Sequence, residues 1–372
     1  MQLISRYYLL LLDPTYFNID TAAPATPEAS VLLIYTGGTI GMAYDADGAL
    51  VPMKFTSIVA NIPELRQFRM RLTVYSLPTP IDSSNVTPTV WAELVRIITR
   101  NYDEYDGFVI LHGTDTMAYS ASGLSFMLEN LTKPVIFTGA QLPIGRIRTD
   151  ARKNLLTALQ LASARHKNID VARIPEVCIY FHNVLLRGNR AKKVESGHFD
   201  AFKSENHPAL VHAGIDLEFN DAAIRPLSEL PRKFHQHLDE RVVILKLFPG
   251  ISEQAVRGIL SIENLRGCVL ETFGSGNAPT APWFTNALRN ALDRGLHMLN
   301  VSQCDEGRVQ QGRYQTSAHL RDLGVIGGDD ITTEAAVAKL MFVLGLNQDA
   351  ATTRRLLARD LRGEITNWEE DR

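Results

Sequence analysis

The 372-residue chain contains few cysteines, no long hydrophobic run and little net charge. Its three cysteines, Cys178, Cys268 and Cys304, are odd in number and widely spaced, which indicates free thiols in a reducing compartment, the cytoplasm. No hydrophobic run approaches the roughly 20 residues that a membrane span needs. A net charge of −3 gives no electrostatic reason to expect nucleic acid or an anionic membrane as a partner.

The composition that remains is that of a soluble globular protein, with 45% hydrophobic and 21% charged residues. The length predicts two domains. Residues 1–30 are expected to be a disordered leader, because residues 21–27 are rich in alanine, threonine and proline. A secretion signal is the alternative, but the hydrophobic run at residues 7–12 is short for one and ends at Asp13-Pro14.

Buried strands alternate with amphipathic helices along the chain, which predicts an α/β fold with a mostly parallel sheet covered on both faces. A polar, irregular stretch at residues 216–240 predicts a linker, so we expect an N-terminal catalytic domain at 31–215 and a smaller C-terminal α/β domain at 241–372. The expected strands are 31–34, 71–77, 108–111, 134–138, 177–181, 242–247, 268–273 and 298–302. The expected helices begin at Pro88 and Met117 or span 155–162, 253–260, 285–294 and 334–346.

A glycine turn follows the first buried strand. Gly37 and Gly38 allow a tight turn, and Thr39 is thereby presented at the carboxyl end of a strand, where open α/β sheets bind ligands. Backbone N–H groups of such a turn can stabilise an oxyanion. An ordinary loop or a phosphate cradle is the alternative, but the turn lacks both the lysine of a P-loop and the G-x-G-x-x-G spacing.

A second turn of this kind, residues 112–116, follows the strand 108–111. Thr114 and Asp115 stand at its carboxyl end, so both turns are expected to converge on one crevice. An N-cap with an acid in the first helical turn is the alternative; it explains Asp115 well but leaves the placement of Thr39 as a coincidence. A threonine hydroxyl needs a base. A lysine of the basic loop 187–193 can act as one, and Arg187, Arg190 and Lys192 are expected to favour its neutral amine.

Together these stretches resemble a known family. YTGGTIGM at 35–42, FVILHGTDTMAY at 108–119, the loop 187–193 and DLRGEIT at 360–366 are similar to the bacterial-type L-asparaginases, specifically the cytoplasmic type I branch. The resemblance runs from about Val31 to Thr366. It implies a two-domain asparaginase fold with a flavodoxin-like C-terminal domain, hydrolysis of L-asparagine to L-aspartate and ammonia without metal or cofactor, and a homodimer or homotetramer with active sites between subunits.

On the matching positions, the resemblance implies that Thr39 is the nucleophile that attacks the side-chain amide carbon. Lys193 serves as base or proton relay beside Thr114, and Asp115 also holds the α-ammonium group of the substrate. The residues expected to bind substrate are Gly38, Asp82, Ser83, Gly113 and Asn277, the last supplied by a neighbouring subunit.

The chain departs from the family pattern at the tyrosine that assists the nucleophile. Some members carry it about ten residues after the nucleophile, where this chain has Ala49. Tyr314 matches a tyrosine that other type I members supply from the C-terminal domain, and we favour it over Tyr44, which is closer in sequence but out of register.

Two other functions remain open on this fold. One is hydrolysis of a different amide, as in glutaminases or glutamyl-tRNA amidotransferase subunits, although the latter carry an added N-terminal domain that 30 residues are too few to form. The other is a non-catalytic amino-acid sensor, which would be expected to have lost the nucleophile or the base, whereas Thr39 and Lys193 are both present.

Overall fold

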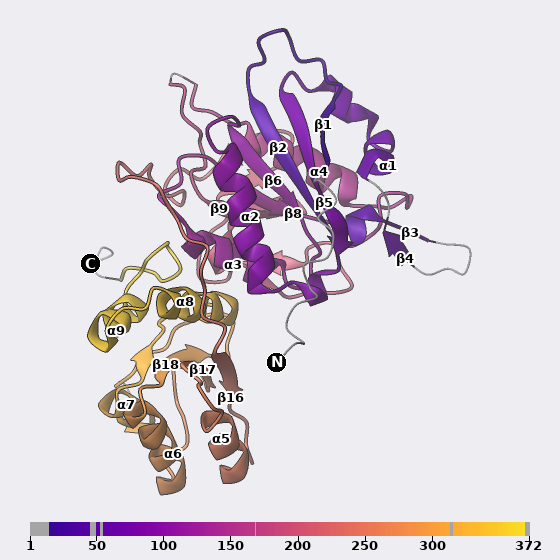
Figure 1. Cartoon of the computed structure of the whole chain (residues 1–372). Helices are drawn as coiled ribbons and strands as arrows, with labels where there is room; N and C mark the ends of the chain where they lie inside the picture. The colour runs from indigo at the N-terminus through magenta and orange to yellow at the C-terminus, as the bar shows by residue number, and fades with distance from the viewer. Residues whose placement is uncertain (1–14, 45–49, 53–54, 168, 313–314, 369–372) are drawn as a thin grey trace, which may run out of the picture.

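The structure, a computed structural model, describes residues 15–44, 50–52, 55–167, 169–312 and 315–368. Within these residues, a nine-stranded sheet forms the N-terminal part and a four-stranded sheet forms the C-terminal part (Figure 1). In the part of the chain that is described, no helix combines the length and hydrophobicity needed to cross a membrane.

The large sheet has the strand order β1-β5-β2-β6-β8-β9-β10-β13-β14. Its strands are β1 (Thr15–Ile19), β2 (Ser30–Gly37), β5 (Arg71–Ile81), β6 (Gly107–Leu111), β8 (Val135–Thr138), β9 (Val177–Phe181), β10 (Val184–Arg187), β13 (Val211–Ala213) and β14 (Leu217–Phe219). The five strands from β5 to β9 pair in parallel, and the strands at both margins pair antiparallel. The carboxyl ends of β5, β2 and β6 therefore lie next to one another.

Both faces of this sheet are buried, which explains the unbroken hydrophobic runs in its central strands. Along β2, Leu33 faces one hydrophobic cluster and the adjacent Leu32 faces the other, because successive side chains of a strand point to opposite faces. One cluster contains α1 (Phe55–Ala60) and α4 (Ala151–Ala162), and the other contains α2 (Pro88–Asn101) and α3 (Met117–Met127).

The C-terminal sheet is parallel throughout, and its strand order β16-β17-β18-β19 follows the chain. Helix α8 lies between this sheet and α3 of the larger part, where the rings of Phe126 and Phe342 stack at 6.0 Å (Figure 1). The strands are β16 (Val242–Lys246), β17 (Gly267–Thr272), β18 (His297–Ser302) and β19 (Ile326–Gly327), and the helices are α5 (Glu253–Leu260), α6 (Pro282–Asp293), α7 (Gln315–Leu323), α8 (Thr333–Gly345) and α9 (Ala350–Ala358).

Short elements connect these units. They are the strands β3 (Met42–Tyr44), β4 (Leu50–Pro52), β7 (Leu128–Glu129), β11 (Lys192–Lys193), β12 (Phe202–Lys203) and β15 (Lys233–Phe234), and the 3-10 helices η1 (Thr39–Gly41), η2 (Pro63–Gln67), η3 (Ser83–Asn85) and η4 (Gly188–Arg190). Strand β15 pairs with β7, so part of the stretch that we expected to be a linker adds to the N-terminal part. The predicted domain boundaries stay a prediction.

The expectation of disorder is wrong for the second half of the leader. Residues 15–19 form β1, which pairs with β5 along the margin of the large sheet. Asn18 accepts a hydrogen bond from Thr73 at 2.7 Å, and the Thr21 hydroxyl donates to the Met70 carbonyl at 2.8 Å. Phe17 and Ile19 pack on the hydrophobic core, which stabilises the strand beside β5. Residues 1–14 lie outside the described residues.

Candidate active site

The turn that carries Thr39 packs backbone to backbone against the turn that carries Thr114. Gly38 has a φ of 86°, and a Cβ added to it would lie 2.5 Å from the Gly113 nitrogen. No side chain fits in such a contact. The hydroxyl of Thr36, at the end of β2, also donates to the Leu111 carbonyl at the end of β6, at 2.8 Å. The two turns are therefore held together at one end of the sheet, as the sequence predicts.

Tyr35 supports the Thr39 turn from inside the fold. Its ring is buried, and its hydroxyl donates to the Gly41 carbonyl at 3.4 Å. A Cβ on Gly41 would lie only 1.9 Å from this hydroxyl, so the turn needs glycine at that position too. Burial raises the pKa of Tyr35 to about 12, which keeps the phenol neutral. Thr39 itself begins η1 and is partly exposed.

A third turn, which contains Asp82 and Ser83, joins the other two. A Cβ on Gly113 would lie 2.5 Å from the Ser83 hydroxyl, and the Thr116 hydroxyl donates to the Ser83 carbonyl at 2.7 Å. Ser83 is buried, whereas Asp82 is exposed. Hydrogen bonds from the Ser84 hydroxyl and backbone N–H lower the pKa of Asp82, so its carboxylate stays ionised.

Lys193 completes the cluster from a distant part of the chain. Its Nζ donates to the Thr114 hydroxyl at 2.7 Å and to the Asp115 carboxylate at 2.6 Å. The Lys193 side chain is 16% exposed, while that of Asp115 is 68% exposed. The structure thus brings an amine, a carboxylate and a hydroxyl into direct contact, beside the turn of a second threonine. This is a set of groups suited to acyl transfer.

Comparison of the sequence with known protein families agrees with this arrangement of side chains. The sequence profile described as "Asparaginase, N-terminal" matches residues 30–225, and the profile described as "Glutaminase/Asparaginase C-terminal domain" matches residues 241–357. The chain belongs to the asparaginase family. The resemblance inferred from the motifs is therefore confirmed, as is the two-domain α/β fold.

Individual relatives agree with this assignment. The chain is 41% identical over 341 residues to L-asparaginase 1 of Escherichia coli (strain K12), covering 91% of this chain and 98% of that protein. It is also 41% identical over 367 residues to 60 kDa lysophospholipase of Mus musculus, covering 91% of this chain and 63% of that protein. The crystal structure of L-asparaginase I from Vibrio cholerae O1 biovar eltor str. N16961 matches with a TM-score of 0.81 at 39% identity, covering 91% of this chain and 99% of that one.

The structure bears on the role that we expected for the three cations near Lys193. Each of them has a carboxylate of its own, because Arg187 pairs with Glu176, Arg190 with Asp330 and Lys192 with Asp305, at 2.7, 3.0 and 2.5 Å. Each charge is therefore partly balanced by its own partner. The expectation that these cations act together on the Lys193 amine stays a prediction.

Two further residues, which the sequence patterns did not single out, contact Thr114 or the turn that carries it. The Thr114 hydroxyl donates to Gln141 Oε1 at 3.2 Å, and Gln141 Nε2 donates to the His198 carbonyl at 3.0 Å. Gln141 follows β8, the neighbour of β6, so its place at the carboxyl end of a predicted strand was the signal that could have found it. The second residue is His112, directly before Gly113.

His112 ends a buried chain of hydrogen bonds that leads to Gly113. Trp91 Nε1 donates to the Ser120 hydroxyl at 2.9 Å, and Ser120 lies 2.9 Å from His112 Nε2. His112 Nδ1 lies 2.7 Å from the Gly113 carbonyl, which can only accept. Nδ1 therefore carries the proton, and Nε2 accepts from Ser120. Burial lowers the pKa of His112 to about 4, which agrees with a neutral ring.

Three candidates remain. Asn277 belongs to the C-terminal part of the asparaginase fold, where it closes a tight loop after β17 by backbone pairing with Phe273. It thus comes from the other part of the chain than the turns of Thr39 and Thr114. Tyr314 lies outside the described residues. Tyr44 ends β3, but its side chain is also outside the description.

Proposed function

We propose that this asparaginase-family protein hydrolyses L-asparagine to L-aspartate and ammonia through a threonine nucleophile. The observation that carries the proposal is the position of Lys193 Nζ, within hydrogen-bonding distance of both Thr114 and Asp115. The turn that carries these two residues packs directly against the turn of Thr39. High identity over nearly the full length of an L-asparaginase supports it.

In this proposal, the Thr39 hydroxyl attacks the side-chain amide carbon, and its proton passes to the group of bases around Lys193. Formation of the new C–O bond gives a tetrahedral intermediate, and backbone N–H groups of the Thr39 and Thr114 turns stabilise its oxyanion. The C–N bond then breaks, and protonated nitrogen leaves as ammonia. Water attacks the resulting β-aspartyl ester, which releases L-aspartate and restores the Thr39 hydroxyl.

Substrate binding is assigned to the exposed charges around the cluster. The Asp115 carboxylate has exposed area left after pairing with Lys193 and can meet the α-ammonium group. Asp82 and Ser83 are proposed to hold the α-amino and α-carboxylate groups of the substrate. Gly38 and Gly113 are proposed to contact the substrate through their backbone. Tyr314 remains our candidate for assisting Thr39.

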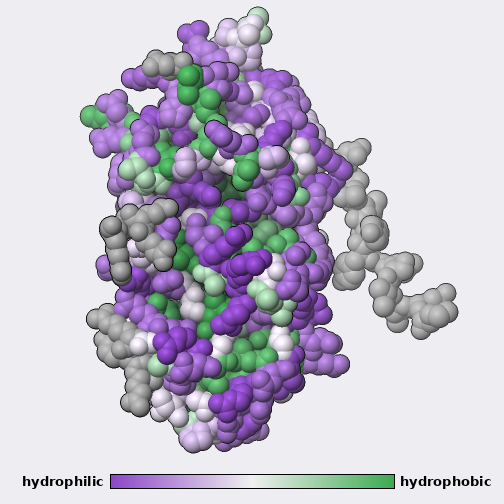
Figure 2. Space-filling model, turned by 90° about the vertical axis from the view of Figure 1, so that its left-hand side faces the viewer, coloured by the Kyte–Doolittle hydropathy of each residue, from purple (hydrophilic) through white to green (hydrophobic). Residues whose placement is uncertain are grey.

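We also propose that the protein is a cytoplasmic homodimer or homotetramer with active sites completed between subunits. Within one chain the cluster is open, since Asp82 and Asp115 face solvent. Ile147 and Ile215 have fully exposed side chains, and Figure 2 shows hydrophobic patches among the hydrophilic residues on one face. A second copy would cover the site and bring in Asn277. The free cysteines of the described residues support a reducing compartment.

Ammonia release from purified protein tests the proposed function. We expect release from L-asparagine, with L-glutamine and D-asparagine measured in parallel. Thr39→Ala is expected to lose this activity while still binding L-asparagine in calorimetry, whereas the matched surface variant Thr285→Ala keeps it. Binding without hydrolysis by the unaltered protein would instead identify a sensor.

The relative named lysophospholipase calls for one further assay, release of fatty acid from a lysophospholipid. The described cluster consists of hydroxyl, amine, carboxylate and amide groups, which suit a small polar substrate better than an acyl chain. We therefore expect no fatty-acid release under conditions in which asparagine is hydrolysed. Release that Thr39→Ala abolishes would require a broader substrate class.

A further inference from the structure

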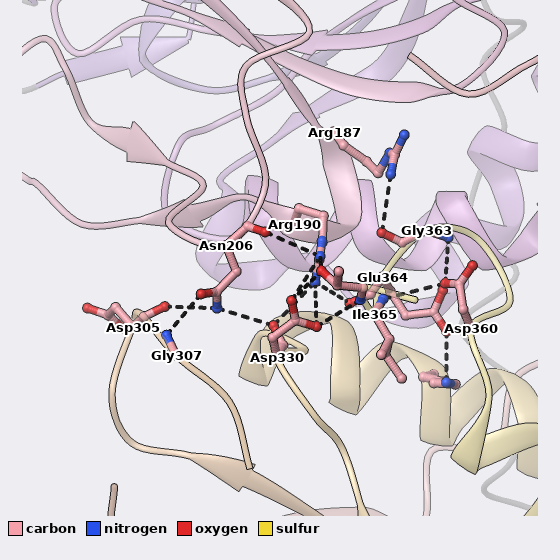
Figure 3. Close-up of polar contacts among 12 residues, drawn as sticks. Arg187, Arg190, Asn206, Asp305, Gly307, Asp330, Asp360, Gly363, Glu364 and Ile365 are labelled. Atoms are coloured by element: carbon pink, nitrogen blue, oxygen red, sulfur yellow. Dashed lines mark hydrogen bonds and ion pairs between the residues drawn. The ribbon is translucent and has the colours of Figure 1, made fainter. Parts of the chain in front are cut away.

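The segment Asp360–Thr366 lies against η4, the short helix that precedes the Lys193 strand (Figure 3). Three consecutive carbonyls of this segment each accept a hydrogen bond from a side chain at η4. Asn189 Nδ2 donates to the carbonyl of residue 362 at 3.1 Å, Arg187 to that of 363 at 3.4 Å, and Arg190 to that of 364 at 2.9 Å. We call the segment Asp360–Thr366 the C-terminal clasp.

Glu364 determines the shape of the C-terminal clasp. Its carboxylate accepts from the backbone N–H of Leu361 at 3.0 Å and of Arg362 at 2.6 Å, which curls the segment around it. It also pairs with Lys339 of α8 at 2.7 Å, and both side chains are fully buried. Lys339 additionally donates to the carbonyl of Arg359, the residue before the clasp, at 2.6 Å, so one side chain of α8 holds the chain at two points.

The other end of the clasp is fixed by Asp330. Its carboxylate accepts from the Thr366 backbone N–H at 2.9 Å and pairs with Arg190 at 3.0 Å (Figure 3). Both ends of the clasp are thus tied to buried charges, and Arg190 is held by the clasp and by Asp330 together. Although burial alone raises the pKa of Glu364, Lys339 and several hydrogen bonds lower it overall, so its carboxylate stays ionised.

Only Ala191 and Lys192 separate η4 from Lys193. Ala191 is fully buried, and β11 pairs with β12 immediately afterwards. On the opposite side, Gly188 packs against α3, where an added Cβ would lie 3.0 Å from Ala121. The chain between Arg190 and Lys193 therefore has little freedom, and a shift of η4 moves the Lys193 amine relative to Thr114.

We propose that the C-terminal clasp is a positioning element for Lys193, with Glu364 as the positioning residue that sets its shape. This inference rests on the proposed function, since Lys193 is assigned there as the base. Glu364 is buried, and its carboxylate contacts Lys339 and the backbone of the clasp, so it acts on Lys193 through the fold of that backbone. Its loss therefore affects the chemical step more than the binding of substrate.

Glu364→Gln tests this, with Asp239→Asn as the matched control. Asp239 is also a buried carboxylate, shortly before β16, but it pairs with Arg241 at 2.7 Å and Arg266 at 2.8 Å instead of the clasp. We expect Glu364→Gln to lower kcat on L-asparagine about tenfold or more with KM changed less than about threefold, a split that indicates a displaced catalytic group. Asp239→Asn is expected to lower Tm and leave kcat unchanged.

A second comparison separates positioning from general damage. In a Lys193→Met background, assayed at high enzyme concentration, Glu364→Gln is expected to cause no further loss of kcat, because the group it positions is gone. A further loss as large as that in the unaltered background, or an unchanged kcat in folded Glu364→Gln, would overturn the inference. The proposed function would survive either result, provided that Thr39→Ala is inactive and the parent active.

Asn189→Leu keeps the inference testable if Glu364→Gln does not fold. It removes one clasp hydrogen bond without leaving a charge unpaired, and Asn189 Oδ1 has no hydrogen-bond partner to lose. We expect kcat to fall about threefold, with KM nearly unchanged and no effect in the Lys193→Met background. Full activity of a folded Asn189→Leu protein would contradict a positioning role for the clasp.

Discussion

Gly38 lies where the backbone of one turn touches the backbone of the next, and this contact places the two candidate threonines at one site. The nearest atoms to an added Cβ belong to the backbone of Gly113 and His112. A side chain there cannot be accommodated by rotating a neighbour. The two turns would have to separate, and Thr39, the proposed nucleophile, would move away from the Lys193 amine.

Gly38→Ala is therefore expected to lower kcat/KM by about 100-fold, the cost of a misplacement near 1 Å. Gly250→Ala is the matched control, because Gly250 has a similar φ of 91° but open space around its Cα. Both variants carry backbone strain, and only Gly38→Ala should lose activity. Equal activities after normalisation for folded protein, measured by steady-state ammonia release, would contradict the contact.

His112 predicts a pH dependence of stability. Its pKa in the folded protein, about 4, lies below the ordinary value of 6.5. The neutral ring therefore stabilises the fold above pH 6.5, and this contribution, about 3 kcal/mol, is lost as the pH falls from 6.5 through 4. Tm of the parent should drop more steeply over this range than Tm of His112→Gln, which does not titrate. Parallel Tm curves would exclude the effect.

At the scale of single residues, candidate site residues could be predicted from the sequence, but the partners of the charged side chains could not. Thr39, Thr114 and Asp115 could be placed because each follows a hydrophobic strand, and parallel strands end together. The partners of Arg187 and Arg190 could not, because Glu176 and Asp330 are brought to them only by tertiary folding. The cluster of positive charges could be read from the sequence, but the carboxylate that pairs with each of them could not.

At the scale of elements, β1 shows how weak sequence signals become structure at the margin of a sheet. Its neighbour β5 offers an unpaired edge, which β1 covers with antiparallel hydrogen bonds and with the side chains of Phe17 and Ile19. The central strands were predictable from their hydrophobic runs. The short antiparallel strands β10, β13 and β14 were not, because their pairing depends on the strands already in place.

Removing β1 is expected to destabilise the protein without touching its chemistry. Deletion of residues 1–29 exposes the edge of β5 and should lower Tm, and Ile19→Ala should lower it by a smaller amount, since truncating a buried isoleucine costs about 2–5 kcal/mol. The kcat of the folded fraction should stay that of the parent. An unchanged Tm for the deletion would mean that β1 contributes nothing to the large sheet.

At the scale of the whole molecule, the two sheets are joined by buried contacts. Helix α8 packs on α3, and Lys339 of the same helix holds Glu364 of the clasp. In our proposals, the C-terminal part therefore acts on the site of its own chain through Lys193 and on the site of a neighbour through Asn277.

Mixing two inactive variants tests the contribution of Asn277 to a neighbouring site. Thr39→Ala and Asn277→Ala are each expected to be nearly inactive. After unfolding and refolding together in equal amounts, half of the dimers are mixed and each has one intact site, so about one quarter of the parent activity should return. Mixtures no more active than their components would show that Asn277 serves its own chain or none.

The proposed function requires that the residue 39 position, Thr114 and Lys193 surround one substrate amide. A crystal structure of Thr39→Ala with bound L-asparagine measures this directly. We predict the side-chain amide between the substituted position 39 and the Thr114 hydroxyl, with the α-ammonium group on Asp115. L-Asparagine bound elsewhere, or with its amide turned away from both positions, would contradict the account.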